Sequence, residues 1–448
     1  MTTEQETPVE ERLEALLDHL GIERAHFAGR TVGEMERLCL ARPEAVSSLT
    51  LVNARLQRGL GVAGVEVLRA HADRLLALFA HSPTPASARL REAISELPGA
   101  RLVTFPEGYD ALGWHDIAAE RTDELATTMR ELMARAEQSH PATRLALPAS
   151  EGELDGISYS IVGEGPALLL FPLSLAHSQW TPLLPALSES FTTVVVGGRH
   201  VGLTAFLEAR AELQGYQRVV RTMLTEVDLQ PGERVLELGC GTGALVRDLA
   251  RRTGGANPIT ALDHNEYLLR EAEALARAEG LDGAIEFREG DAEALSIEAD
   301  AYDVTFSSTL IGEGDADRMM AEHVRVTRPG GRVAITARAL DLPHSLNLDV
   351  SDTIRRKVAA PRVGGGLAAG GCADASLYDR FVRSGLTDIR MMPMWGPTFP
   401  PPDYWVDSCM HLLTTEEGEA FQAALREGIE AGTAFGGPVY HVAVGTKP

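Results

Sequence analysis

A glycine-rich turn near the middle of the chain has the residue types and the spacing of a ligand-binding loop. Residues 233–243 read ERVLELGCGTG, in which the apolar letters predict a buried strand and the glycines at 239, 241 and 243 predict a tight turn into a helix. Glycines let the backbone approach a ligand closely, and the start of a helix offers unpaired N–H groups. Because the same letters also satisfy the pattern GxGxxG/A, the glycine spacing alone does not select the ligand.

Carboxylates at the ends of three predicted strands indicate which ligand the glycine turn binds. Glu237 lies inside the motif, where it would repel a pyrophosphate but favour a cationic amino group or a hydroxyl. Asp263 ends the next predicted strand, 20 residues after Gly243, which is the position of a carboxylate that binds ribose hydroxyls. Asp291 follows a third predicted strand and is placed to accept from an adenine amino group. A nicotinamide oxidoreductase is therefore the less favoured hypothesis.

The region from about residue 214 to residue 339 resembles class I S-adenosylmethionine-dependent methyltransferases. The resemblance rests on VLELGCGTG, ALDHN, EGDAEAL, YDVTFSS and VRVTRPGGRVAI, which follow one another in the family's order and spacing, whereas STLIGEGD departs from the family's usual histidine-bearing loop. It implies a Rossmann-like sheet with an antiparallel last strand, and S-adenosyl-L-methionine as the cofactor. The cofactor-binding residues that it implies are Glu237, Gly239, Cys240, Gly241 and Gly243 at the methionine part, Asp263, His264 and Leu268 at the ribose and adenosine, Asp291 and Ala292 at the adenine, and Ser307 on the sulfonium side. A binding fold that has lost its cofactor is the alternative.

Methyl transfer from a sulfonium depends mainly on alignment of the acceptor and exclusion of water. A neutral hydroxyl or amine acceptor adds the need for a base within hydrogen-bond reach. His344, just past the fifth predicted strand, is the first candidate for this catalytic base and His411 is the second. A histidine at the surface or at the edge of the core is the alternative for both. His323 is predicted to be solvated on an outer helix.

Residues 341–373 and 395–410 are predicted to form a substrate cap, because ligands bind outside the carboxyl ends of parallel strands. The second segment is rich in aromatic side chains and prolines, which predicts a small, mostly apolar acceptor, as in the biosynthesis of secondary metabolites. The alternative is that these side chains only seal the fold. They are Trp395, Phe399, the prolines at 400–402, Tyr404 and Trp405.

Residues 1–203 resemble α/β-hydrolases in an unusual order. The stretch LLDHLGIERAHFAGRTVGEMERLCLARPEAVSSLTLVN, with its GxTxG turn, resembles the central part of that family, and residues 156–202 resemble its beginning. The resemblance implies a circular permutation, with 1–140 as the back half and 150–203 as the front half of one sheet. The expected fold is α/β throughout, with doubly wound domains at 1–203 and 204–448.

The catalytic positions of the hydrolase family are poorly matched. Thr31 stands where the serine would be, and Tyr109 stands where the histidine is expected, with His115 six residues later. Residues 81–83 are His-Ser-Pro rather than an acid, and Pro172-Leu173 replaces the usual His-Gly. The favoured interpretation is a non-catalytic scaffold that docks, dimerises or shapes the acceptor site. A working hydrolase that uses Thr31 and an ordinary α/β domain are the alternatives.

The composition excludes several classes of function. The chain has 448 residues, with 41 Lys and Arg against 64 Asp and Glu, so its net charge of −23 would repel a nucleic acid or an anionic membrane. The four cysteines are far apart and form no CxxC, which leaves no metal site or disulfide framework to predict. The N-terminus lacks the pattern of a leader peptide, so a cytoplasmic location is expected. A bifunctional hydrolase/methyltransferase, a protein that uses bound S-adenosylmethionine without methylation, and a homodimer all stay open.

Overall fold

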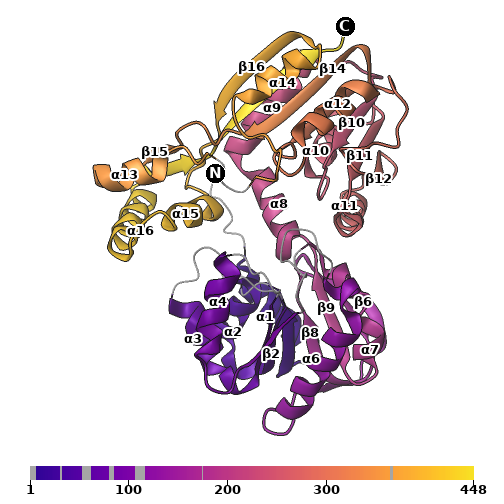
Figure 1. Cartoon of the computed structure of the whole chain (residues 1–448). Coiled ribbons are helices and arrows are strands. Elements are labelled where there is room, and N and C mark those ends of the chain that lie inside the picture. Colours follow the sequence, from indigo (N-terminus) through magenta and orange to yellow (C-terminus); the bar gives the residue numbers. More distant parts are fainter. Residues whose placement is uncertain are drawn as a thin grey trace. The chain divides into compact units, whose positions relative to one another are not determined.

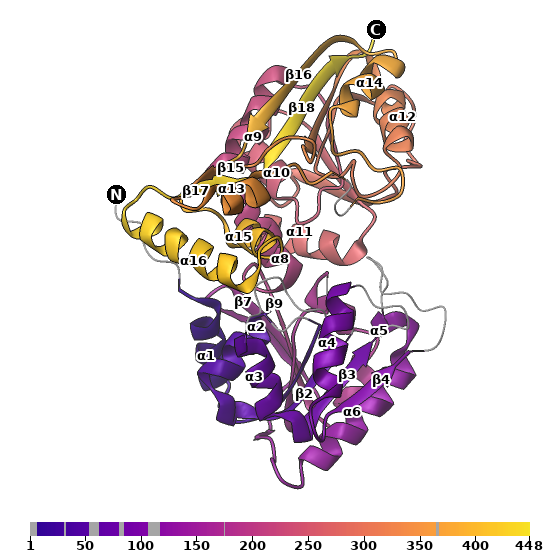
Figure 2. The ribbon, with the colours of Figure 1, turned by 60° about the vertical axis from the view of Figure 1, so that its left-hand side comes forward.

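The chain forms two compact units, each with its own sheet. The computed structural model describes residues 7–30, 33–52, 62–79, 85–105, 117–173, 175–363 and 367–448. The units are Met1–Phe206 and Leu207–Pro448, and the boundary between them falls within helix α8, Gly202–Glu212. Helices cover both faces of each sheet (Figures 1 and 2). Within the described ranges, no helix is both long enough and apolar enough to cross a bilayer.

The first unit contains a nine-stranded sheet with the order β4-β3-β2-β1-β8-β9-β7-β6, to which β5 adds by pairing with β8. The strands from β4 to β9 along this order are parallel, and β7 is antiparallel to both of its neighbours. Strands of the back half and of the front half therefore share one sheet, as predicted. Their bounds are β1 Ala25–Gly29, β2 Val46–Val52, β3 Leu75–Phe79, β4 Arg101–Thr104, β5 Arg144–Leu145, β6 Ser150–Leu154, β7 Ile157–Val162, β8 Gly165–Leu170 and β9 Thr192–Gly197.

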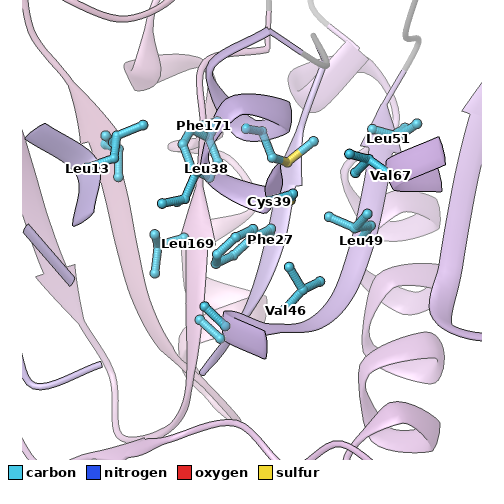
Figure 3. Close-up of a cluster of buried hydrophobic side chains, with 14 of the residues drawn as sticks. Leu13, Phe27, Leu38, Cys39, Val46, Leu49, Leu51, Val67, Leu169 and Phe171 are labelled. Carbon is cyan, nitrogen blue, oxygen red and sulfur yellow. The ribbon is translucent and has the colours of Figure 1, made fainter. Parts of the chain in front are cut away.

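Two apolar cores, one on each face, hold this sheet between helices. Along β8 the side chains alternate, so that Leu169 enters one core while Leu168 and Leu170 enter the other, as the period of a strand requires. Figure 3 shows the first core, in which Phe27 and Leu169 of the sheet meet Leu38 of a covering helix. The helices of the first core are α1 Val9–His19, α2 Gly33–Ala41, α3 Val62–Ala70 and α4 Pro85–Ser95, and those of the second are α5 Ile117–Glu120, α6 Thr122–Ala136 and α7 Leu184–Ser188.

A buried polar link ties the end of α6 to the sheet. His26 is fully buried on β1, and its Nδ1 lies 2.8 Å from the Ser48 hydroxyl while its Nε2 lies 3.1 Å from Glu137 Oε1. The same Glu137 oxygen accepts a hydrogen bond from the backbone N–H of Ala142 at 2.7 Å. The short connection from the back half to the front half is thus fixed against β1. Four predicted hydrolase positions, Thr31, residues 81–83, Tyr109 and His115, lie outside the described residues.

The second unit contains a seven-stranded sheet with the order β12-β11-β10-β13-β14-β18-β16. Strand β18 is antiparallel to β14 and to β16, and the other neighbouring pairs are parallel, so the predicted antiparallel last strand is confirmed. The strands are β10 Val235–Leu238, β11 Ile259–Asp263, β12 Ile285–Glu289, β13 Tyr302–Ser308, β14 Thr327–Arg338, β16 Thr387–Trp395 and β18 Val439–Thr446. The helices packed on this sheet are α9 Gln214–Val227, α10 Ala244–Thr253, α11 Glu266–Ala278, α12 Ala316–Val326 and α14 Ser376–Arg383.

A small helical lobe extends from the second unit beyond the end of β14. It consists of the short strand pair β15 Ser345–Asn347 and β17 Phe435–Gly437 with helices α13 Asp352–Ala359, α15 Asp403–Met410 and α16 Thr415–Glu430. Figures 1 and 2 both show these elements grouped apart from the seven-stranded sheet. The lobe has its own apolar core, in which Trp405 and Phe421 are fully buried. Parts of both predicted cap segments lie in this lobe.

Candidate functional site

The glycine turn has a backbone conformation that residues with side chains rarely adopt. Gly239, Gly241 and Gly243 have φ values of +68°, +56° and +71°. A Cβ atom at Gly239 would lie 2.6 Å from Leu310 Cδ1, and one at Gly243 would lie 2.9 Å from Phe287 Cε1. Side chains at these positions would therefore be both strained and crowded. The turn places the N-terminus of α10 at the carboxyl edge of the sheet, as predicted from the sequence.

Asp263 supports this turn from the next strand. Its Oδ2 accepts a hydrogen bond from the backbone N–H of Gly241 at 2.8 Å, and its Oδ1 accepts one from Asn265 at 3.0 Å. Burial raises the pKa of the Asp263 carboxyl, and these backbone donors act in the opposite direction. A carboxylate has about four acceptor positions, so acceptor capacity is left for a ligand hydroxyl.

Glu237 is a buried carboxylate that lacks a full set of partners. Its side chain is 2% exposed, and within the described part of the chain its Oε2 has no hydrogen-bond partner. Burial raises the pKa of Glu237 well above its usual range, the nearby Asp263 raises it further, and Arg210 lowers it. Because a buried acceptor is rarely left without a donor, this oxygen fits the ammonium group of an amino-acid ligand. The chemistry of the site thus agrees with the cofactor that the sequence predicts.

Four residues that the sequence analysis did not select complete this edge of the sheet. Arg210 of α8 donates from Nη1 to the Thr309 hydroxyl at 3.2 Å, and its guanidinium lies 5.1 Å from the centre of the Tyr216 ring. The Tyr216 hydroxyl is 2.7 Å from Ser308 Oγ. Arg210 and Tyr216 lie outside the stretches that carry the family resemblance, so only the fold brings them to Thr309 and Ser308. The link runs through Ser308, whereas the sequence analysis selected its neighbour Ser307.

Ser307 and His323 point into the opposite layer of the unit. Ser307 is 1% exposed, and its hydroxyl lies 3.2 Å from His323 Nε2, while Nδ1 of the same histidine lies 3.1 Å from Thr305 Oγ1. The prediction that His323 is solvated is wrong. His323 lies on the buried face of α12, and it is 1% exposed. Helical periodicity turns this face of α12 towards the sheet, and two hydroxyls satisfy the ring nitrogens. Burial lowers the pKa of His323 to about 3.

His323→Gln is expected to reduce the sensitivity of the second unit to acid. The pKa of His323 is about 3 in the fold and about 6.5 when exposed, so its neutral form stabilises the fold above pH 6.5 and this stability falls as the pH decreases towards 3. Between pH 7.5 and pH 5 the wild type should lose about 2 kcal/mol more unfolding free energy than the variant. Urea denaturation at both pH values measures this difference. Equal slopes for His323→Gln and the wild type would contradict the prediction.

The remaining predicted cofactor residues line the same edge of the sheet. Cys240 is buried within the turn, and burial raises the pKa of its thiol, which disfavours the thiolate. His264 is half exposed, with Nδ1 3.6 Å from Asp263 Oδ1, and Leu268 is buried at the start of α11. The other two residues are an exposed Asp291, whose Oδ1 accepts from the Glu293 N–H at 2.8 Å, and a buried Ala292.

The two predicted catalytic histidines occupy different surroundings. His411 is exposed directly after α15, and its role stays a prediction. His344 is 8% exposed, and its Nδ1 accepts a hydrogen bond from Trp405 Nε1 at 2.8 Å. An indole N–H can only donate, so the lone pair of Nδ1 is already used. This geometry does not fit a base, and the sequence-based hypothesis of base catalysis by His344 is not retained.

Comparisons with known proteins agree with the geometry of the second unit. A family model described as a methyltransferase domain matches residues 235–331, which span β10 to the first part of β14. The C-terminal half contains a class I S-adenosylmethionine-dependent methyltransferase domain. The matched region carries Glu237, the glycine turn and Asp263.

The curated relatives of the methyltransferase domain act on small molecules, as their names state. The chain is 33% identical over 151 residues to the glycine/sarcosine/dimethylglycine N-methyltransferase of Actinopolyspora halophila, which is 33% of this chain and 26% of that protein. It is 33% identical over 122 residues to the nocamycin O-methyltransferase of Saccharothrix syringae, which is 27% of this chain and 43% of that protein. The chain therefore spans less than half the length of either relative. A solved structure, the putative sarcosine dimethylglycine methyltransferase from Galdieria sulphuraria, has 20% identity and a TM-score of 0.34, with 52% of this chain and 86% of that chain covered.

Proposed function

We propose that the second unit binds S-adenosylmethionine and transfers its methyl group to a small, mostly apolar acceptor. The observation that carries this proposal is the unpartnered Oε2 of Glu237, buried beside a turn of three glycines with positive φ. A buried carboxylate in this position requires a cationic group, and the amino group of the cofactor supplies one. The family match over residues 235–331 supports the same cofactor.

Each residue of the site would bind a different part of S-adenosylmethionine. Glu237 would hold the amino group of the cofactor, and Arg210, which is the nearby cation, would hold its carboxylate. The glycine turn would accommodate the amino-acid part, Asp263 would accept from the ribose hydroxyls, and Asp291 would accept from the adenine. When bound, S-adenosylmethionine supplies an activated methyl group. The protein then has to align the acceptor and keep water out.

Exposed aromatic side chains support an apolar acceptor. Trp395 is 55% exposed and Phe399 is 60% exposed, although large apolar side chains are usually buried. The bridge between Thr398 and Gly436 is antiparallel, which places Phe399 opposite Phe435, itself 37% exposed. We propose that this surface contacts the acceptor. Trp405 corrects part of the sequence prediction, because at 1% exposure it belongs to the core of the lobe and cannot line such a surface directly.

Calorimetric titration tests the proposed cofactor. S-adenosylmethionine is expected to bind saturably and NAD is not, since Glu237 repels a pyrophosphate. Asp263→Asn should weaken S-adenosylmethionine binding by about 10-fold to 100-fold, because it removes hydrogen bonds to a charged acceptor. Asp282→Asn, at an exposed position after α11, is the matched control and should bind like the wild type. Saturable binding of NAD, or no binding of S-adenosylmethionine to folded protein, would refute the proposal.

We infer that the first unit is a circularly permuted α/β-hydrolase-like scaffold. When residues 150–203 are read before residues 9–136, its eight main strands follow in the order β6, β7, β8, β9, β1, β2, β3 and β4, and the sheet order becomes 1-2-4-3-5-6-7-8. Only the second strand of this reading is antiparallel to the others. This is the arrangement expected of one continuous sheet whose chain has been cut and rejoined. We assign the scaffold no reaction.

A further inference from the structure

A polar cluster lies where the helical lobe joins the end of β14. Arg362 donates from Nη1 to the Ser408 hydroxyl at 2.6 Å and from Nη2 to Cys409 Sγ at 3.4 Å. His344 stacks on the Trp405 indole, with ring centres 6.3 Å apart, and accepts the indole N–H. Trp405 itself is held by packing, because its ring fills the space that a Cβ at Gly436 would need. The indole therefore fixes the orientation of the His344 ring.

His344 can act in this cluster only as a hydrogen-bond donor. Burial, followed by the nearby charge of Arg362, lowers the pKa of His344 to about 4, so the ring is neutral at pH 7. A neutral imidazole carries one proton, and the Trp405 N–H occupies Nδ1, so the proton resides on Nε2. In the described part of the structure no protein group accepts from this Nε2. The ring thus presents one N–H to whatever binds beside it.

Arg362 is a cation without a carboxylate partner among the described residues. Its hydrogen bonds go to a hydroxyl, a thiol and the Val358 carbonyl, and its Nε is buried without any partner. This is unexpected in a chain with 64 acidic and 41 basic residues, where acids are plentiful. Leaving a part-buried cation and a buried N–H uncompensated is unfavourable unless a ligand completes them. The Nε2–H of His344 and the guanidinium of Arg362 are therefore donors that a negatively charged oxygen of a ligand would satisfy.

The position of the cluster in the fold suits a methyl acceptor. The backbone N–H of Arg362 donates to Leu340, and that of His344 donates to Ala359, so both residues flank the segment that leaves the carboxyl end of β14. Strand β14 is two strands away from β10, which bears Glu237. At the usual strand spacing this separation is about 10 Å, the size of a small molecule. Ligands of parallel sheets bind at this carboxyl edge.

We propose that His344 Nε2 and the Arg362 guanidinium bind a carboxylate of the acceptor and so select acceptors that are apolar molecules bearing an anionic group. This inference rests on the proposed function, because it assigns the second substrate of the same unit. His344 is then a binding residue rather than the base that the sequence suggested. The exposed aromatic side chains would contact the apolar part of the same molecule.

Paired probes test the carboxylate site without knowledge of the natural acceptor. Benzoate and benzamide have nearly the same shape, but only benzoate is charged. In calorimetric titrations of the full-length protein, benzoate should bind at least about 10-fold more tightly than benzamide. Arg362→Gln should weaken benzoate binding by about 10-fold to 100-fold and leave benzamide binding unchanged. Arg362→Lys keeps the charge but loses the planar pair of donors, so it should give an intermediate loss.

Matched measurements make each outcome decisive. Arg356→Gln removes the same charge from an exposed position on α13, and it should bind benzoate like the wild type. No benzoate binding, equal binding of benzoate and benzamide, or equal benzoate binding by Arg362→Gln and the wild type would each overturn the inference. S-adenosylmethionine titration of the same variants separates the two proposals. Benzoate selectivity without S-adenosylmethionine binding would leave the carboxylate site standing and refute the proposed methyl transfer.

Discussion

Glu237→Gln is expected to weaken S-adenosylmethionine binding by about 100-fold and at the same time to stabilise the protein without cofactor. Both effects come from one feature, a buried carboxylate with an unpartnered Oε2 beside a second buried acid, Asp263. Glutamine has almost the same size and keeps one oxygen, so the variant removes the charge and preserves the packing.

The loss of affinity follows from the partner that Glu237 is placed to hold. A hydrogen bond between charged groups in a buried site contributes more than a neutral one, and removal of one member leaves the other buried and uncompensated. About 2.7 kcal/mol corresponds to the expected 100-fold change. Glutamine could still accept a hydrogen bond from the ammonium group, but it would not neutralise the charge.

The gain in stability follows from the cost of the charge in the absence of the cofactor. Burial raises the pKa of Glu237 and the repulsion from Asp263 raises it further. A carboxyl whose folded pKa is raised stabilises the fold in its protonated form, and this contribution is lost as the pH rises from the usual carboxyl value through the folded pKa. The variant should therefore exceed the wild type in unfolding free energy at pH 7.5, and the difference should shrink at pH 5.

Calorimetry and thermal unfolding check the two parts separately. Glu273→Gln, at an exposed position on α11, is the matched control and should change neither property. If Glu237→Gln lowered the unfolding temperature of the cofactor-free protein, the carboxylate would have a structural partner and its role in binding would have to be reconsidered. If the variant kept wild-type affinity, the assignment of the ammonium position would be wrong.

Local sequence patterns predicted the elements of both sheets because buried parallel strands are short apolar runs bounded by turns. Glu237 and Asp263 were found for the same reason, since each stands at the end of such a run. That strands of residues 1–140 and 150–203 share one sheet was predicted from the resemblance of each stretch to α/β-hydrolases. These are properties of residues that are close in sequence.

Side-chain direction and long-range partners were not predictable in this way. Ser307 and Ser308 are neighbours, but alternation along β13 turns one towards His323 and the other towards Tyr216. The burial of His323 and of Trp405 depends on which face of each helix meets the rest of the unit. Arg210 reaches Thr309 across 99 residues of sequence, and no local pattern links the two residues. The hydrogen bond that His344 accepts from Trp405, 61 residues away, was likewise not predictable from the local sequence.

Arg247→Ala is expected to destabilise the second unit by about 3–5 kcal/mol, the largest stability change that we predict for a single side chain. Arg247 is 2% exposed on α10, and its Nη2 donates to both carboxylate oxygens of Glu208 at 2.6 Å. Glu208 is 6% exposed, so removal of the arginine would leave its charge buried and unpaired. Urea denaturation of the purified variant measures the change.

A second arginine on the same helix, Arg251, provides a matched control. Arg247 and Arg251 both donate to Glu279, but the Arg251 side chain is 49% exposed. Arg251→Ala should therefore cost less than about 1 kcal/mol, because exposed ion pairs are screened by solvent. Equal losses for the two variants would show that burial of the Arg247–Glu208 pair is not the cause.

The same network links the stability of the unit to the glycine turn. Glu208 Oε1 also accepts a hydrogen bond from the Thr242 hydroxyl at 2.6 Å, and Thr242 lies between two of the turn's glycines. Without Arg247, Glu208 would lose the bidentate partner that holds it in place, and Thr242 would then lose its fixed acceptor. Arg247→Ala should therefore also weaken S-adenosylmethionine binding, by about 10-fold. The double variant Glu208→Gln/Arg247→Met removes both charges and should recover most of the lost stability, because no buried charge is then left unpaired. A double variant as unstable as Arg247→Ala would mean that packing around the arginine, and not its charge, supports the turn.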